Sequence, residues 1–168
     1  MKKPLLLLLL LFLMLLQSCW RNLQDDVGFV EESRYQPITQ QRSSFEATMT
    51  IMGDRPVLNS GKIYVKDDLI YLNEKSEGFH IIDNSDPENP VPRAFLNIPL
   101  ATDLAIRNNI VYVHHAVDLV AFTYNANSLK IVHRERNVFP ELRSPDGYDA
   151  SFFDVPEDEV VIGYELVN

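Results

Sequence analysis

Two adjacent histidines, His114 and His115, are the first candidates for chemistry, because imidazole nitrogens are common ligands for zinc and copper. Both end an apolar run typical of a β-strand, where neighbouring side chains point to opposite faces and cannot easily bind one metal ion. His80 and His133 have no Cys or His at metal-ligand spacing. The chain also lacks a nucleophile elbow, a P-loop, a dinucleotide fingerprint and a His-Glu-x-x-His motif. We therefore predict no metal site, no cofactor and no catalytic residue.

Oxygen-bearing side chains are dense in residues 83–90, which read Asp-Asn-Ser-Asp-Pro-Glu-Asn-Pro. The segment could suggest a calcium loop, but it lacks the glycine and the ordered acidic positions of such a loop. Asp and Asn before proline are ordinary turn formers. We therefore predict a turn, and its motif consists of Asp83, Ser85, Asp86, Pro87 and Pro90.

The N-terminus has the layout of a secretory signal, with Lys2 and Lys3 followed by a twelve-residue apolar block at 5–16. Twelve helical residues span about 18 Å, well short of the roughly 30 Å hydrocarbon core of a bilayer. The block is therefore too short for a permanent membrane span. Residues 1–18 are predicted to be a signal peptide.

Leu16-Gln17-Ser18-Cys19 resembles the lipobox of bacterial lipoproteins, in which the cysteine is diacylated and becomes the new N-terminus. Leu16 and Ser18 match that pattern, while Gln17 is an uncommon residue at its position. Cys19 is the only cysteine, so an exported chain could form no internal disulfide with it. The resemblance implies a lipid anchor at Cys19. Because Trp20 follows it in place of the aspartate of inner-membrane retention, the resemblance also implies the outer membrane, on its periplasmic or surface side.

The chain has 168 residues and a net charge of −9; removing residues 1–18, with their two lysines, makes it −11. Phosphate binding depends on clustered Lys and Arg, so a nucleic-acid partner is excluded. About 150 residues suffice for one domain with a real core.

Before the first repeat, residues 19–36 are predicted to be a flexible tether, since they are polar and have no apolar period. Residues 37–60 are predicted to contain a short helix at 39–52. Thr39 is its N-cap, and Phe45, Met49 and Met52 follow at helical spacing.

An internal repeat begins at residue 61. Residues 63–72 match residues 104–113 in pattern at an offset of 41, and residues 79–83 match 119–123 at an offset of 40. We predict two units, 61–99 and 100–138, of four strands each. Residues 139–168 are predicted to be either a partial third unit or C-terminal strands, with strands at 150–155 and 160–166. The strands are expected at 62–65, 69–74, 78–83, 93–98, 103–107, 110–114, 118–124 and 130–135.

The turns and the strand pattern favour an all-β, propeller-like fold. Asp67-Asp68 and Asn108-Asn109 suit two-residue hairpins. Residues 69–72 and 110–113 are apolar at every position, which predicts strands covered on both faces. Antiparallel four-stranded sheets of about 40 to 45 residues are the blades of β-propellers.

Residues 79–90, an apolar strand ending in Asp and running into Ser-Asp-Pro-x-x-Pro, resemble the LVIVD repeat of Bacteroidetes lipoproteins. The second unit departs from that repeat, because Thr-Tyr-Asn-Ala-Asn stands at 123–127 where the turn motif is expected. The resemblance implies a β-propeller lipoprotein without a general catalytic activity.

These observations predict a cell-envelope lipoprotein that acts as a non-catalytic binding or scaffold module, with the membrane and an unidentified protein or glycan as partners. Two alternatives stay open: an envelope hydrolase, or an accessory subunit of one, for glycan or peptide substrates, and a truncated remnant of a longer propeller protein. A propeller needs about four blades. Two units would therefore leave open blade faces, through which the chain could associate with itself.

Overall fold

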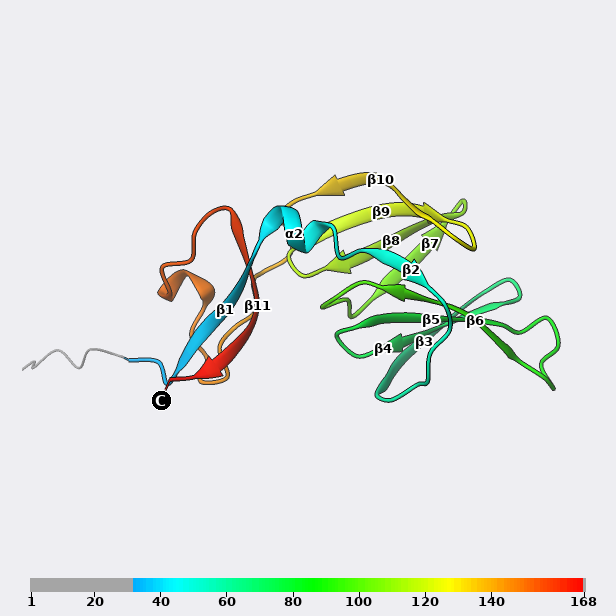
Figure 1. The fold of residues 1–168 in the computed structure, drawn as a ribbon, viewed down its shortest axis with the longest axis horizontal. Coiled ribbons are helices and arrows are strands. Elements are labelled where there is room, and N and C mark those ends of the chain that lie inside the picture. The colour runs from blue at the N-terminus through cyan, green and yellow to red at the C-terminus, as the bar shows by residue number, and fades with distance from the viewer. Residues whose placement is uncertain (1–31, 168) are drawn as a thin grey trace, which may run out of the picture. The chain divides into compact units, whose positions relative to one another are not determined.

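The computed structural model describes residues 32–167, which form three antiparallel sheets and no closed barrel (Figure 1). Strands account for 50% of the structure and helices for 6%, which confirms the all-β prediction. Among the described residues no helix is long and apolar enough to cross a membrane.

Sheet 1 contains five strands in the order β2-β6-β5-β4-β3, and sheet 2 contains four in the order β10-β9-β8-β7. The predicted bounds of β4, β5 and β9 agree with the structure, and those of the other five repeat strands lie within two residues of it. The strands are β2 (Thr50–Met52), β3 (Ser60–Lys66), β4 (Leu69–Glu74), β5 (Gly78–Asp83), β6 (Val91–Asn97), β7 (Leu104–Arg107), β8 (Ile110–His115), β9 (Asp118–Tyr124) and β10 (Leu129–Glu135).

Tight turns join the first two strands of each repeat. Asp67 has φ +53°, and Asn108 and Asn109 have φ +50° and +61°. Asp and Asn enter this left-handed region at lower cost than other residues with a Cβ. These turns fix the register in which β3 pairs with β4 and β7 with β8.

The main core lies between sheets 1 and 2, which use opposite faces to form it. We call the face with the tyrosine at the third position of the second strand, Tyr71 in sheet 1 and Tyr112 in sheet 2, the tyrosine face; the other is the aliphatic face. The tyrosine face of sheet 1 packs on the aliphatic face of sheet 2. The core side chains are Tyr71, Phe79, Ile81, Ala94 and Leu96 from sheet 1 and Leu104, Val111, Val113, Val120 and Phe122 from sheet 2.

Residues 69–72 and 110–113, which were predicted to be covered on both faces, are buried or partly buried at every position. In β8 the buried side chains alternate with partly exposed ones, and in sheet 1 the aliphatic face leaves Ile63 and Val65 64% and 65% exposed. Each sheet therefore buries one face in the contact between the two repeats, and its other face is covered only in part.

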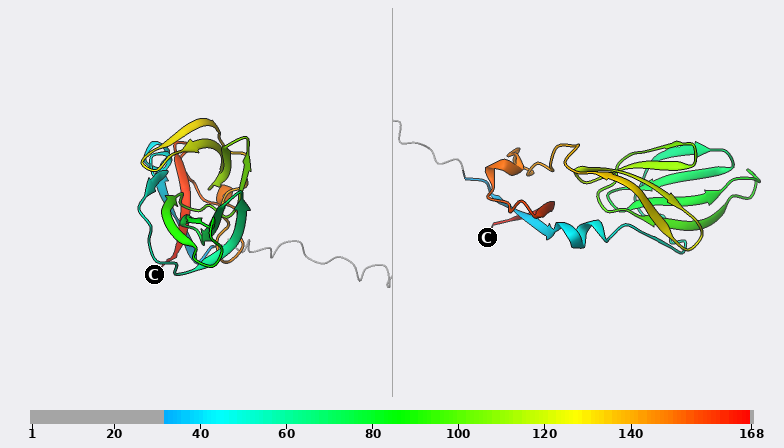
Figure 2. Two further views of the ribbon diagram at one scale, coloured as in Figure 1. Left: turned by 90° about the vertical axis from the view of Figure 1, so that its right-hand side faces the viewer. Right: turned by 90° about the horizontal axis from the view of Figure 1, so that it is seen from above.

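Sheet 3 pairs the two ends of the described chain, β1 (Tyr35–Gln41) with β11 (Glu159–Leu166). It lies at one end of the molecule, beside the stacked sheets 1 and 2 (Figure 2). The predicted strand at 160–166 is present as β11, but the predicted strand at 150–155 is wrong. A 3₁₀ turn, Ala150–Phe152, occupies that segment, and the partner of β11 comes from the other end of the sequence.

The predicted helix at 39–52 is also wrong in extent. Only α2 (Arg42–Glu46) is helical, between strands β1 and β2, so the predicted tether also ends earlier, before Tyr35. Thr48 ends the helix by donating its hydroxyl to the carbonyl of Phe45, 2.6 Å away. Pairing with β11 and β6 satisfies the flanking backbone, and those distant partners override the local helical spacing.

A small apolar cluster joins sheet 3 to the β8–β9 hairpin. Phe45 of α2 and Val160 of β11 pack against Ala116 and Val117 of that hairpin. All three sheets are thus connected through sheet 2.

Candidate functional site

A groove of about 730 Å³ lies against the tyrosine face of sheet 2, and its lining is mainly apolar. Tyr112 and Leu119 form part of its floor, and the segment 139–143 forms the opposite wall. Pockets of this size, with apolar walls and a few polar groups, are typical binding sites. We treat this groove as the candidate site.

Hydrogen bonds at two points hold the wall segment in place. The amide of Phe139 donates to the carbonyl of Val117 at 2.9 Å, and the hydroxyl of Tyr164 in β11 donates to the carbonyl of Leu142 at 2.8 Å. Sheet 3 therefore positions the wall, although its own strands lie mostly outside the groove. The side chain of Leu142 stays 46% exposed, so apolar surface is available at the rim.

The polar groups of the groove lie at its rim. His114 is 3.3 Å from the hydroxyl of Thr102 and packs edge-on against Phe139, and burial lowers its pKa. Asp103 accepts hydrogen bonds from Lys62 and Tyr64, and these donors lower the pKa of the carboxyl. Arg143 forms an ion pair of 2.6 Å with Asp149. Partners within the protein thus already engage Asp103 and Arg143, two of the three charged side chains that line the groove.

The two adjacent histidines point to opposite sides of β8, as the strand geometry predicts. His114 faces the groove, whereas His115 is fully buried and stacks on Phe45 with 4.0 Å between ring centroids. No group of three or more His, Cys, Asp or Glu in the described part of the chain could hold a metal ion.

Arg134 fixes the protonation of His115. Its guanidinium nitrogen Nη1 lies 3.2 Å from Nδ1 of His115, and an arginine can only donate, so Nδ1 must be the acceptor. The ring proton then lies on Nε2, which faces the hydroxyl of Thr48 at 3.4 Å. Burial and the nearby Arg134 lower the pKa of His115 to about 3.

A buried ion cluster beside His115 was not predicted from the sequence. Asp118 is fully buried and accepts hydrogen bonds from Arg134 at 2.6 Å, from Arg42 at 3.1 Å and from the amide of Asn137 at 3.2 Å. Burial alone would raise the pKa of Asp118, but these donors outweigh it and the pKa is lowered. The cluster connects α2 to the hairpin and so supports one end of sheet 2. The only signal in the sequence was a charged residue at the start of an apolar strand.

The corresponding place in sheet 1 holds a second buried pair, also missed by sequence reasoning. Glu74 is fully buried and lies 3.0 Å from Nε2 of His80. The backbone amides of Leu58 and Asn59 also donate to this carboxylate, which holds the segment just before β3 on the sheet. Burial alone would raise the pKa of Glu74, but these partners keep it lowered.

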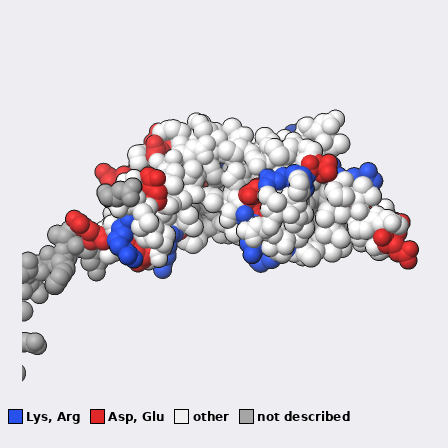
Figure 3. Space-filling model, turned by 60° about the horizontal axis from the view of Figure 1, so that its bottom comes forward, with Lys and Arg blue, Asp and Glu red and all other residues white. Residues whose placement is uncertain are grey.

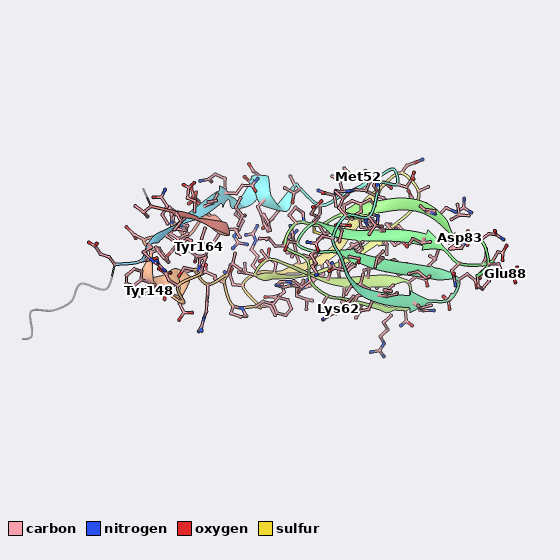
Figure 4. The ribbon with its side chains drawn as sticks, turned by 90° about the horizontal axis from the view of Figure 1, so that it is seen from below. Met52, Lys62, Asp83, Glu88, Tyr148 and Tyr164 are labelled. Atoms are coloured by element: carbon pink, nitrogen blue, oxygen red, sulfur yellow. The ribbon has the colours of Figure 1, made fainter. Side chains whose placement is uncertain are left out.

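The predicted turn motif lies at the far end of sheet 1, where Figure 4 shows Asp83 and Glu88 well away from Tyr148 and Tyr164. Asp83 accepts a hydrogen bond from the backbone amide of Ser85 and forms an ion pair with Arg93, both within 2.9 Å. Asp86 accepts bonds from Glu88 and Asn89 within the same loop, which also contains Pro87 and Pro90. The carboxylates of Asp83 and Asp86 therefore close this loop, and the loop is separate from the groove.

In the second repeat Asn125 closes the equivalent turn. Its side-chain oxygen accepts hydrogen bonds from the amides of Asn127 and Ser128 at 3.0 and 2.9 Å. An amide oxygen therefore replaces the aspartate of the first repeat, which explains why the turn forms without the Ser-Asp-Pro motif.

The lipobox-like residues Leu16, Gln17, Ser18 and Cys19 lie outside the described residues, as do the predicted signal peptide and most of the tether. No family model matches the chain, and neither curated proteins nor solved structures give a significant match. The LVIVD resemblance therefore stays a prediction.

The groove offers apolar contact with a few hydrogen-bonding groups at the rim. His114 has a hydroxyl neighbour in Thr102, but Asp103, the nearby carboxylate, is bound by Lys62 and Tyr64. A hydrolytic triad needs the carboxylate to orient the histidine. The mainly apolar lining of the groove is instead suited to holding an apolar group.

The geometry of His115 makes stability depend on pH. Between its ordinary pKa of 6.5 and its folded pKa of about 3, the unfolded chain binds a proton that the folded chain does not. The free energy of unfolding should therefore fall as the pH drops below 6.5, and His115 alone should account for about 2 kcal/mol at pH 5.

Urea unfolding of wild type, His115→Phe and His133→Gln at pH 7.5 and pH 5 measures this effect. His115→Phe should lose much less stability between the two pH values than wild type, whereas His133→Gln, at an exposed position, should behave as wild type. Because His114 acts in the same direction in all three proteins, the difference isolates His115. An unchanged pH dependence in His115→Phe would show that burial and Arg134 do not lower the pKa of His115.

Proposed function

We propose that the chain is an envelope lipoprotein whose β-sheet domain is a non-catalytic binding or scaffold module. The observation that carries the binding role is the groove on sheet 2, whose floor and wall are apolar and partly open to solvent. The Leu-rich segment and the lipobox-like residues 16–19 support the location.

The composition of the groove supports an apolar protein segment as its partner more than a glycan. Sugar sites combine an exposed aromatic platform with free hydrogen-bonding groups, whereas Asp103 and Arg143, two of the groove's three charged side chains, already have partners in the chain. Leu119, Pro140 and Leu142 instead offer aliphatic surface. Burying such surface against a partner contributes about 25 cal/mol per Å² of apolar area, from which the entropy lost on association must be subtracted.

The distribution of surface charge also bears on which kind of partner the domain can bind. Charged atoms occur in small groups of both signs with uncharged surface between them, on the face that Figure 3 shows. The net charge of −9 disfavours nucleic acid as a partner.

The membrane anchor can be tested separately from the groove. Cys19→Ala in the full chain should abolish the incorporation of radiolabelled palmitate, because no other cysteine can take a thioether-linked lipid. A Ser18→Ala variant keeps a small residue before the cysteine and should be labelled as wild type. Labelling that persists in Cys19→Ala would refute lipidation.

Light-driven incorporation of bis-ANS, a fluorescent apolar probe, tests the groove. Peptides that contain residues 112–119 and 139–143 should carry the label, because the probe enters the apolar groove. Leu142→Asp places a charge at the rim and should reduce labelling of these peptides at least fivefold. Leu166→Asp, at a comparably exposed leucine of sheet 3, is the matched control and should not.

Labelling of peptides from residues 60–72 serves as an internal reference, since this part of sheet 1 also exposes apolar side chains outside the groove. Equal labelling of the groove peptides in Leu142→Asp and wild type would mean that the groove does not bind apolar groups, and the proposal would fail.

A further inference from the structure

The packing of sheet 1 on sheet 2 joins unlike faces of two equivalent units. The repeat offset of 41 places Tyr71 on Tyr112, yet Tyr71 lies in the core between the sheets while Tyr112 lies on the far side of sheet 2. The contact is therefore head-to-tail. In the stacked pair, the tyrosine faces of both sheets point in one direction and the aliphatic faces of both sheets point in the opposite direction.

Such packing leaves two unlike faces at the ends of the pair, each covered only in part by other segments of the chain. At one end is the aliphatic face of sheet 1, where Ile63 and Val65 are 64% and 65% exposed. Their equivalents in sheet 2 are Leu104, which is only 6% exposed, and Ile106, which packs against the core. At the other end is the tyrosine face of sheet 2, which is accessible at Ala105, an exposed residue, and at the half-buried Tyr112, whereas Phe139 of the wall covers His114.

The same face thus occurs twice in the described chain, once covered and once open along β3, and the covered copy shows what fits it. The aliphatic face of sheet 2 is covered by a tyrosine face, that of sheet 1. In the described chain the only other tyrosine face is the one on sheet 2 itself. It faces away from sheet 1, so it can reach an open aliphatic face only in another molecule.

We propose that the aliphatic face of sheet 1 docks on the tyrosine face of sheet 2 in a second copy of this chain. This inference rests on the proposed binding role, because that tyrosine face includes the floor of the groove. The contact is heterologous, so it repeats from copy to copy and either closes a ring or grows into a filament.

The contacts inside the chain predict those between copies. The hydroxyls of Tyr71 and Tyr124 lie 2.6 Å apart at the interface of the two sheets. By the repeat offsets of 41 and 40, Tyr71 corresponds to Tyr112 and Tyr124 corresponds to Asn84. In the proposed contact, Tyr112 of one copy therefore lies near Asn84 of the next, and these two side chains can also form a hydrogen bond. The contact between Tyr64 and Asp103 likewise maps onto Ala105 and Lys62, next to Ile63.

Cross-linking between two differently tagged full-length chains, both with Cys19→Ser, tests the docking. One chain carries Ile63→Cys and the other Ala105→Cys, and a short bismaleimide joins cysteines that lie close together. We expect the mixed dimer in at least fivefold higher yield than when Leu166→Cys, a 59% exposed leucine of sheet 3, replaces Ile63→Cys.

A charge on the aliphatic face should prevent the contact. Adding Val65→Glu to the Ile63→Cys chain should reduce the mixed product to the level of the Leu166→Cys control. Val132→Glu, at a 53% exposed valine of β10, should leave the yield unchanged. Because Val65 and Val132 are exposed, neither change disturbs the core.

Two results would overturn the inference: no mixed product above the Leu166→Cys control, or a product only between two Ile63→Cys chains, which would mean that the aliphatic face packs on itself. If either occurs while bis-ANS still labels the groove, self-association is refuted and the proposed binding role stands. If labelling of the groove fails as well, both are wrong.

Discussion

The contact between the tyrosine face of sheet 1 and the aliphatic face of sheet 2 is the constraint on which the rest of the structure depends. Burial of Phe79, Leu96 and Phe122 there supplies the main core. The same contact decides which faces remain open. Because two equivalent sheets meet through unlike faces, one aliphatic face and one tyrosine face are left only partly covered within the described chain. The groove and the proposed contact between copies both follow from this arrangement.

Buried polar groups hold the N-terminal part of the described chain on this core, at equivalent positions of the two repeats. Glu74 and His115 are related by the offset of 41, and both are fully buried at the ends of their strands. Glu74 binds the backbone of Leu58 and Asn59, while His115 stacks on Phe45. Breaking such a buried pair leaves an unpaired polar group, which is costly. These pairs therefore fix where the N-terminal segments lie, and through α2 they connect sheet 3 to the rest.

Local patterns in the sequence were enough to predict the repeat strands, because their hairpin partners are adjacent in the chain and their turns carry Asp and Asn. The same reasoning failed where the partner is distant. Strand β1 pairs with β11, more than 110 residues away, and no local pattern reports that pairing. The groove could not be predicted either, since its floor and its wall come from separate segments that sheet 3 brings together. The roles of Asp118 and Glu74 likewise depend on donors from other elements.

A double-mutant cycle on Tyr71→Phe and Tyr124→Phe tests the central claim most directly, because these hydroxyls meet only if the sheets pack through unlike faces. Each change removes one oxygen and little volume, so the fold should persist. Urea unfolding of the four proteins should give a coupling free energy of about 1 kcal/mol, the contribution of one hydrogen bond between neighbouring side chains. A coupling free energy within about 0.3 kcal/mol of zero would mean that the two residues act independently. This result would contradict the packing of the tyrosine face of sheet 1 on the aliphatic face of sheet 2.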